Sequence, residues 1–391
     1  MRSENSTVFR VRTNGLLHDE LSVPFICNVF LFFFGLFFFC LQPSVGLGQQ
    51  VELQRFEFTR PLMGVEFKIV LYAESETVAA DAAEEAFAEI QLFDASLSDY
   101  KSGSEIRRLC GSAPHAKPVP ISERLWRTIQ HSETMHQKTN GAFDITIGPL
   151  SRVWRTARKR NRLPTDVKVN DALAQMGMQH IRLVERKSGD ESDVESNQET
   201  RKFLQLDLAN MQLDFGGIAK GLAADSALKV LSDAGVNSAL IDASGDVVVS
   251  DAPPGEEAWS VEIPSTDEST ATISLVNGAV ATSGDVYQFL EVDGVRYSHL
   301  VDPKTGRAIT TPRIVTVIGR DGMTCDSYAS AISVLGQEGL TDIEFEGLSI
   351  QIIEGSNRKL TQFSHFRTPK FPSIQSSSND QAPQKSKSGF R

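Results

Sequence analysis

The sequence predicts an α+β fold in which mixed or antiparallel sheets carry helices inserted between groups of strands. Strand-like segments follow one another in meander-like groups joined by short turns, and helix-like segments stand between these groups. This pattern lacks the regular alternation of strand and helix that a doubly wound parallel sheet requires. The part of the chain that carries the pattern extends from about residue 51 to about residue 367.

The first elements are two strands within residues 56–73, FEFTRPLMGVEFKIVLYA, with a turn at Pro61–Gly64. A helix over 78–97 follows, because apolar residues recur there on one face at helical spacing. A second helix begins after Ser122, a favourable N-cap, and ends near Gly141, a residue type that commonly follows helix ends.

The middle of the chain is predicted to continue with short strands. Phe143 and Asp144 begin a strand that Gly148–Pro149 ends. The runs LQLDL and MQLDF predict a hairpin through Ala209–Asn210. The helix that starts in the glycine-rich stretch after this hairpin ends at Gly235.

The C-terminal half is predicted to be mostly strands. Residues 238–250 and 259–264 are strand-like, and 271–284 contains two strands around an Asn-Gly turn. Residues 313–319, RIVTVIG, form a further strand, and a helix over 324–335 ends at a glycine.

Residues 1–48 have the layout of an export signal. Charged residues precede the unbroken apolar run VFLFFFGLFFFCL at 29–41, and small residues around Gly46–Gly48 offer a cleavage site. The run is shorter than the ~20 apolar residues of a membrane-spanning helix, so we expect a cleaved signal, with a retained anchor as the alternative. The expected location is the periplasm or the outer face of the cytoplasmic membrane, and the apolar segment leaves membrane association open. Residues 372–391 are rich in Ser, Gln and Lys without apolar periodicity, and predict a disordered tail.

Composition excludes some classes of function. The formal net charge of −11 argues against nucleic acid as the main partner, because phosphate binding needs a basic face. Beyond the leader the chain keeps only Cys110 and Cys325, which do not make a disulfide framework, and no CxxC zinc pattern is present.

The glycine-rich stretch LDFGGIAKGLAAD, residues 213–225, is a candidate ligand site. It is neither a Walker loop nor a dinucleotide fingerprint, so a plain turn into a helix is the alternative. Asp214 at a strand end and Lys220 in the first helical turn add to its interest. A lysine is unfavourable at that end of the helix dipole, and an anionic ligand would account for it.

Two further stretches carry chemistry-bearing side chains. His299, near the Asp302–Gly306 turn, is the best-placed candidate for proton transfer at neutral pH, although a lone histidine is more often structural. Asp326 and Ser330 are four residues apart and share a helix face, where their oxygens suit Mg²⁺. The alternative is an acid that only balances the helix dipole.

The fourth stretch is TNGAFDITIGPLSRVW, residues 139–154. Phe143 beside Asp144 could hold a base or a flavin ring, or belong to the core.

Taken together and in order, these stretches resemble the signature motifs of the ApbE-type FAD:protein FMN transferases, formerly grouped as thiamine-biosynthesis lipoproteins. The resemblance extends from about Glu57 to Gly336. Its blocks are MGVEF (63–67), LSDYKSGSEI (97–106), TNGAFDITIGPL (139–150), LDFGGIAKGLAAD (213–225), IDASGD (241–246), ATSGD (281–285), SHLVDPKTG (298–306) and the helix with CD and AS (325–330). It implies a single, T-fold-related catalytic unit.

The resemblance also implies a set of binding residues. FAD would contact Met63, Tyr100, Ala142, Phe143, Asp144, Asp214, Lys220 and Val301. Mg²⁺ would be held by the Gly217 carbonyl oxygen, the Asp326 carboxylate and the Ser330 hydroxyl. Some relatives carry threonine at the position of Gly217, and many at that of Ser330, and both exchanges keep an oxygen available. Ala329 stands where some relatives have a second acidic ligand, which leaves fewer protein ligands for the metal. The lipid-attachment motif of the family is missing.

The implied activity is Mg²⁺-dependent transfer of the FMN moiety of FAD to a threonine hydroxyl of an exported acceptor protein, with release of AMP. His299 is the candidate base for the threonine proton. Two alternatives stay open: hydrolysis of FAD to FMN and AMP at the same site, and non-catalytic binding or storage of flavin.

Overall fold

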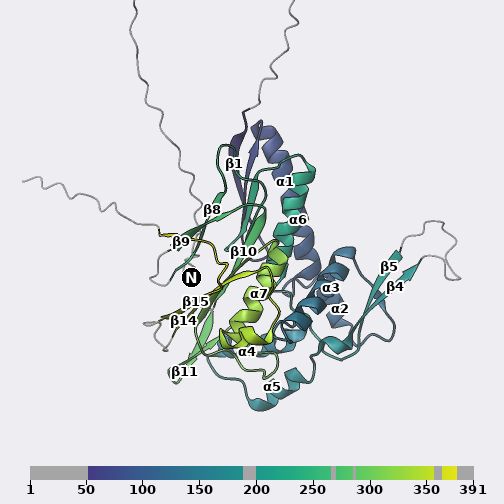
Figure 1. The fold of residues 1–391 in the computed structure, drawn as a ribbon. Helices are drawn as coiled ribbons and strands as arrows, with labels where there is room; N and C mark the ends of the chain where they lie inside the picture. The colour runs from purple at the N-terminus through teal and green to yellow at the C-terminus, as the bar shows by residue number, and fades with distance from the viewer. Residues whose placement is uncertain (1–51, 188–199, 266–269, 285–287, 356–362, 377–391) are drawn as a thin grey trace, which may run out of the picture.

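The α+β class is confirmed by a computed structural model, which describes residues 52–187, 200–265, 270–284, 288–355 and 363–376 (Figure 1). Within these residues the α-helices are α1 Glu76–Leu97, α2 Glu105–Gly111, α3 Glu123–Lys138, α4 Gly148–Arg160, α5 Asp166–Leu173, α6 Ala219–Asp233 and α7 Gly322–Leu335. Short 3-10 turns cover Ile145–Ile147, Met178–His180 and Glu338–Asp342.

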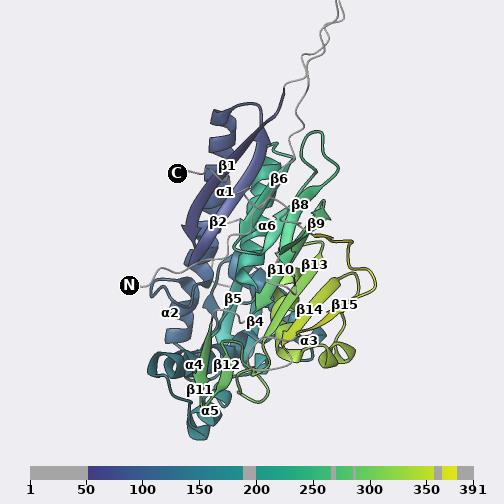
Figure 2. The same ribbon diagram turned by 90° about the vertical axis from the view of Figure 1, so that its left-hand side faces the viewer.

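An eight-stranded antiparallel sheet forms the centre of the molecule. Its order is β1-β2-β6-β7-β10-β13-β14-β15. The strands are β1 Gln54–Leu62, β2 Val65–Ala73, β6 Ala239–Ala243, β7 Val247–Val249, β10 Gly278–Gly284, β13 Arg313–Gly319, β14 Ser349–Gly355 and β15 Phe363–Arg367. Helices α1, α6 and α7 cover one face (Figure 1), and a small sheet of β8 Trp259–Pro264, β9 Thr270–Leu275 and β16 Gln375–Ser376 covers the other (Figure 2).

Strand alternation explains the two layers. In β2, Phe67, Ile69 and Leu71 belong to the core under the helices, whereas Val70 belongs to the core under β8 and β9. Successive side chains of a strand point to opposite faces, so one continuous apolar run can serve both cores. Each fully buried side chain of this size contributes roughly 1.5–3 kcal/mol of transfer free energy.

Smaller elements lie beside this framework. A three-stranded sheet consists of β3 Val119–Pro120, β5 Thr200–Leu206 and β4 Ile181–Lys187, and the β4–β5 hairpin projects from the body in Figure 1. The hairpin of β11 Phe289–Val292 and β12 Val295–Ser298 packs with α4 and α5 around its own apolar cluster. Trp154 is at the centre of that cluster, and its indole N–H donates to the carbonyl of Gly306 (3.0 Å).

Helices α6 and α7 cross at glycines. A Cβ on Gly221 would lie 2.1 Å from the carbonyl oxygen of Gly322, so a larger residue cannot fit without separating the helices. Asp225 of α6 accepts hydrogen bonds from the backbone N–H groups of Gly322 (2.7 Å) and Met323 (2.8 Å). Asp225 of α6 thus caps the N-terminus of α7, in addition to Asp321, which is the N-cap residue of α7 itself.

Several predicted elements are confirmed. The β1–β2 turn contains Met63 and Gly64 with positive φ angles of 51° and 81°. Ser122 caps α3 by accepting the N–H of Leu125 (3.2 Å). Helix α6 ends before Gly235, and α7 ends before Gly336 with a φ of 72°.

The predicted hairpin through Ala209–Asn210 is wrong. LQLDL lies largely in β5, which pairs with β3 and β4, and residues 211–215 form no strand. The backbone N–H of Leu213 donates to Cys110 Sγ (3.3 Å), and that of Asp214 donates to the carbonyl of Ile145 (2.8 Å). Tertiary partners therefore take the donors that a hairpin ladder would have used.

The strand predicted at Phe143 and Asp144 is also wrong. Asp144 caps the 3-10 turn Ile145–Ile147 by accepting the N–H of Thr146 (2.7 Å), and α4 follows directly. Pro149 does not end a strand but lies in the first turn of α4, where a missing N–H is not needed.

Strand boundaries differ in other places. Residues 238–250 form two strands, because Ser244 and Gly245 with positive φ make a tight turn between β6 and β7. The strands around Asn277 are present, but β9 pairs with β8 and β10 with β7 and β13, so they are not a hairpin. Within the predicted tail, Gln375–Ser376 pair with β9, and residues 377–391 lie outside the described ranges.

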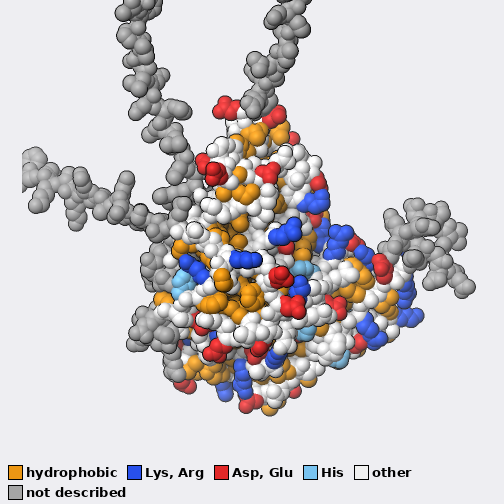
Figure 3. Space-filling view, in the orientation of Figure 1, with side chains coloured by type: hydrophobic (Ala, Val, Ile, Leu, Met, Phe, Trp, Pro, Cys, Tyr) orange, Lys and Arg blue, Asp and Glu red, His pale blue; other side chains and the backbone are white. Residues whose placement is uncertain are grey.

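Acidic and basic side chains are interspersed over the face in Figure 3. In the described part of the chain, no helix has the length and apolar character needed to cross a bilayer. The apolar run at 29–41, on which the predicted signal or anchor rests, lies outside the described residues.

Candidate active site

The glycine-rich turn before α6 contacts α7 at the predicted metal ligands. Asp214 accepts the N–H of Gly216 on Oδ1 (2.9 Å), which shapes the turn. A Cβ on Gly217 would lie 2.7 Å from Ser330 Oγ and 3.4 Å from the ring of Phe143. A larger residue at 217 would therefore require the turn or the Ser330 side chain to shift.

Next to this turn lies an ionic trio, which we define as Lys220, Asp246 and Asp326, with both carboxylates buried and the lysine side chain 26% exposed. Lys220 Nζ bonds Asp246 Oδ2 and lies 3.6 Å from Asp326 Oδ1. The second oxygen of Asp326 accepts the N–H of Gly221 (3.3 Å), and that of Asp246 accepts the N–H of Thr282 (3.3 Å). The two carboxylates account for a lysine in the first turn of α6, so its position does not by itself require an anionic ligand.

Burial and charge shift the pKa values in the trio. Burial raises the pKa of Asp326 to about 7, and the neighbouring Asp246 raises it further while Lys220 opposes the shift. Burial disfavours the charged form of Lys220, but Asp246 and Asp326 outweigh it and raise the lysine pKa above its ordinary value. With all three groups ionised, the trio carries one uncompensated negative charge.

The donors around the trio fit Mg²⁺. A carboxylate (Asp326), a hydroxyl (Ser330) and a turn carbonyl (Gly217) are hard oxygen donors, and the excess negative charge favours a divalent cation. The described residues contain no group of three or more His, Cys, Asp or Glu side chains that could hold a metal. A site of this kind would thus use one carboxylate and leave positions for water or substrate oxygens.

On the other side of the turn, an arginine joins two loops. Arg155 of α4 bonds Asp99 (2.5 Å) and Asp214 Oδ2 (3.1 Å). Its guanidinium lies 4.5 Å above the centre of the Tyr100 ring, whose residue is 76% exposed. Two predicted FAD contacts, Tyr100 and Asp214, are therefore held by one side chain.

The loop after α3 lines a cavity of about 330 Å³. His136 Nδ1 is 3.0 Å from the carbonyl oxygen of Phe143 and 3.7 Å from Asp144 Oδ2. The cavity is lined by His136, Gln137, Asn140, Gly141, Asp144, Pro303 and Lys304. The fold thus brings the TNGAFD stretch beside the DPKTG turn, which are far apart in sequence.

His299 follows β12 and lies within electrostatic range of the site. Its Nδ1 is buried without a hydrogen-bond partner among the described residues, and its backbone N–H donates to the carbonyl of Gln288 (2.9 Å). Burial lowers its pKa to about 4, with the positive charge of Arg158 as the next cause, and Asp214 opposes the shift. The imidazole is therefore neutral at pH 7, because burial and Arg158 disfavour its protonated form. Asp302, in contrast, binds groups of its own turn, Lys304 N–H and Thr305 Oγ1.

Three predicted FAD contacts lie at the edge of this assembly. Met63 is in the β1–β2 turn. Close to this turn, Ser244 Oγ of the β6–β7 turn donates a hydrogen bond to the carbonyl of Glu66 in β2 (3.1 Å). Ala142 is buried in the main core. Val301 is buried in the separate cluster around Trp154, so its backbone rather than its side chain is left for a ligand.

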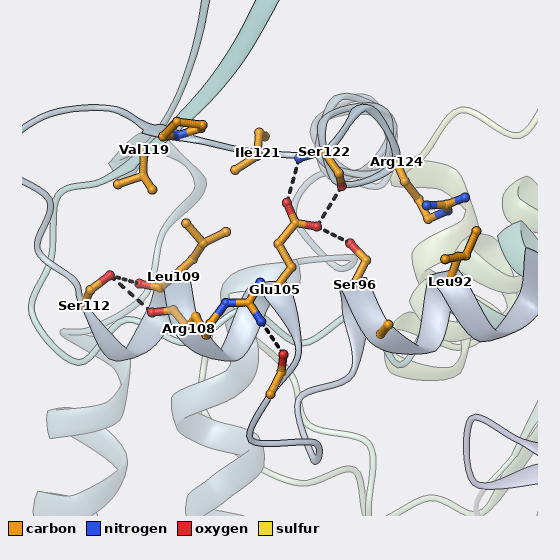
Figure 4. Close-up of a pocket in the computed structure, with 13 residues that line it drawn as sticks. Leu92, Ser96, Glu105, Arg108, Leu109, Ser112, Val119, Ile121, Ser122 and Arg124 are labelled. Carbon is orange, nitrogen blue, oxygen red and sulfur yellow. Dashed lines mark hydrogen bonds between the residues drawn. The ribbon is translucent and has the colours of Figure 1, made fainter.

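A larger cavity, of about 550 Å³, lies between α1, α2 and the start of α3, apart from these residues (Figure 4). Glu105 accepts hydrogen bonds there from the backbone N–H (2.7 Å) and hydroxyl (2.7 Å) of Ser122 and from the hydroxyl of Ser96 (2.6 Å). Its carboxylate joins the N-terminus of α3 to α1, which is a structural role.

Sequence reasoning missed three residues of the site. Asp246 stands in the quoted block IDASGD, so its signal was present without an assigned partner. Asp99 likewise stands in the quoted block LSDYKSGSEI without an assigned partner, whereas Arg155 gave no signal, because the pairing joins α4 to the loop after α1. Only the tertiary arrangement brings them together.

Comparison with known proteins identifies relatives of the chain in sequence and in structure. The sequence model of the ApbE family matches residues 63–350. The FAD:protein FMN transferase of Klebsiella pneumoniae is 30% identical over 317 residues, covering 78% of this chain and 87% of the relative. That of Salmonella typhimurium is 31% identical over 282 residues, covering 70% and 77%. The crystal structure of the flavinyl transferase ApbE from Pseudomonas stutzeri, apo form, superposes with a TM-score of 0.68 at 26% identity, covering 81% of this chain and 95% of that one.

Proposed function

Because the chain belongs to the ApbE family, we propose that it is an FAD:protein FMN transferase that uses Mg²⁺, modifies a threonine of an acceptor protein and releases AMP. The observation that carries this proposal is the contact of Gly217 with Ser330, one helical turn from Asp326 and beside Lys220. This contact brings oxygen donors for a cation next to the positive charge of Lys220. Transfer from a diphosphate needs both, because negative charge on the phosphate oxygens must be neutralised.

The bond changes are a displacement at phosphorus. The threonine Oγ bonds to the phosphorus of the FMN half, the bond from that phosphorus to the bridging oxygen breaks, and AMP leaves with that oxygen. The hydroxyl proton passes to His299, whose neutral imidazole has one ring nitrogen, Nδ1, without a partner among the described residues. When bound, Mg²⁺ neutralises charge on the diphosphate.

The protein side chains divide the remaining work. Asp326, Ser330 and the Gly217 carbonyl would hold the cation, and Lys220 is fixed in place by Asp246. Tyr100 presents an exposed ring for stacking of a flat group. An anionic diphosphate near His299 would raise the histidine pKa towards neutrality, where proton transfer is most efficient.

One assay separates this reaction from FAD hydrolysis and from flavin storage. The full chain is incubated with FAD, Mg²⁺ and a candidate acceptor that carries a family-type threonine motif. Flavin fluorescence that stays with the acceptor in a denaturing gel supports transfer. Free FMN and AMP without a labelled acceptor would indicate hydrolysis, and bound unaltered FAD would indicate storage.

The matched control is Asp302→Asn, which changes a carboxylate of the neighbouring turn without touching the proposed cation ligands. Asp326→Asn is expected to abolish transfer and Asp302→Asn to retain most of it. Full transfer by Asp326→Asn, or full transfer with a chelator present, would contradict the metal assignment.

We also propose that the chain acts after export, on the periplasmic side of the cytoplasmic membrane. Support comes from the charged, apolar and small-residue segments in residues 1–48. Cell fractionation with N-terminal sequencing of the purified protein tests it. An N-terminus near residue 49 supports a cleaved signal, and an intact leader in the membrane fraction supports an anchor. An intact leader on protein in the cytoplasmic fraction would refute export.

A further inference from the structure

We propose that Arg155 is a positioning residue for FAD, which aligns the Tyr100 ring with the glycine-rich turn through its contacts to Asp99 and Asp214. The proposal rests on the proposed function, since it takes Tyr100 as the stacking surface for a flat ring of FAD. Arg155 itself is not expected to contact the reacting atoms.

Arg155 stacks on the ring of Tyr100. The guanidinium covers one face of the Tyr100 ring at 4.5 Å, while the residue remains 76% exposed. An exposed tyrosine in a loop would otherwise sample several rotamers, and holding it costs conformational entropy on binding. The arginine stack fixes the ring plane in advance and leaves the opposite face for a ligand ring.

Arg155 also connects two segments of the chain through Asp99 and Asp214. Its two ion pairs join the loop after α1 to Asp214, whose other oxygen holds the N–H of Gly216. The next residue, Gly217, is the proposed carbonyl ligand of the cation. One side chain therefore fixes the distance between the proposed ring-binding and cation-binding ends of the site.

The positive charge of Arg155 also compensates the negative charges of Asp99 and Asp214. Burial and the nearby Asp214 raise the pKa of Asp99, and Arg155 opposes that shift. Asp99 and Asp214 are thus close enough to repel each other, and the arginine between them is what keeps the two loops together. Lysine would retain the positive charge but lose the planar stack and the forked donors.

The experiment is a double-mutant cycle on FAD affinity, measured by quenching of flavin fluorescence in the full chain. Arg155→Ala and Tyr100→Ala are each expected to raise the Kd for FAD about tenfold, which corresponds to about 1.4 kcal/mol. The double variant is expected to bind within about twofold of either single variant, because both changes remove the same aligned ring. Arg155→Lys is expected to lie between wild type and Arg155→Ala.

Arg152→Ala is the matched control, since Arg152 lies on the same helix with an exposed side chain and is expected to bind FAD like wild type. Circular dichroism and the unfolding midpoint identify any variant that fails to fold, in which case Arg155→Lys carries the test. Additive losses in the cycle, or unchanged Kd in Arg155→Ala, would overturn the proposal while leaving transfer by the wild type intact. Failure of the wild type itself to bind FAD would instead refute the proposed function.

Discussion

The two ends of the candidate site are built on different physical principles. The carboxylates of the ionic trio are buried, with Asp246 and Asp326 only 2% and 4% exposed, and α6, α7 and the β6–β7 turn supply its groups. The Tyr100–Arg155 end consists of an exposed ring in a loop and an arginine on α4. A buried charge must be compensated within the protein, whereas an exposed one is also stabilised by water. The first end should therefore control stability and chemistry, and the second should control ligand affinity.

Removing a partner from the buried trio tests this difference most strongly. Asp246→Ala is expected to lower the free energy of unfolding by about 3 kcal/mol, because it takes the closer counter-ion from the lysine. Urea denaturation measures the change. The control is Asp233→Ala, which breaks the exposed Lys229–Asp233 pair on α6, the helix that also carries Lys220. This variant should change the free energy of unfolding by less than about 0.5 kcal/mol. Equal effects would show that burial does not distinguish these pairs.

A smaller effect is expected from crowding the turn carbonyl. Gly217→Ala places a Cβ 2.7 Å from Ser330 Oγ, so the turn or the hydroxyl must shift. We expect a loss of about 100-fold in transfer rate, the order typical of a displacement of about 1 Å in a catalytic site. Gly216→Ala is the neighbouring control, because its Cβ would meet only Asp214 Oδ1 at 3.1 Å. The two rates are compared at saturating FAD, and a Gly216→Ala defect as large as that of Gly217→Ala would contradict a special role for residue 217.

The smallest expected effect concerns His299, which interacts electrostatically with Arg158, Asp214 and Lys220. Its pKa of about 4 is below the ordinary 6.5, so its contribution to stability is complete above pH 6.5 and is lost as the pH falls towards 4. Arg158→Gln removes a positive charge that lowers this pKa, and the pKa should rise. An NMR titration of the imidazole signals measures it, with Arg160→Gln as an exposed control on the same helix. A pKa that stays at 4 would contradict the contribution of Arg158.

Local signals in the sequence were sufficient for much of the framework. The cap at Ser122, the helical spacing in α1 and the Met63–Gly64 turn each depend on neighbouring residues. Two local signals misled. Pro149 indicates a break in a strand and a start in a helix equally well, and the alternation in LQLDL and MQLDF does not specify which strand pairs with which.

The site was less accessible than the fold. Asp326 and Ser330 share a helix turn, so their spacing predicted a shared face. The resemblance supplied Gly217 and Tyr100, and the glycine-rich stretch itself drew attention to Asp214, but the residues that hold them in place came from the structure. Arg155 is separated from Asp99 by 56 residues and from Asp214 by 59, and no local pattern reports such a pairing.

The glycine crossing of α6 and α7 has a consequence for the timing of assembly. Gly221 leaves no room between the helices, and Asp225 fastens the first turn of α7 to α6. The turn that precedes α6 and the oxygens on α7 are therefore brought into register while the polypeptide folds, before any ligand arrives. A nucleotide that enters would meet cation ligands already in position, with the Tyr100 loop held beside them by Arg155.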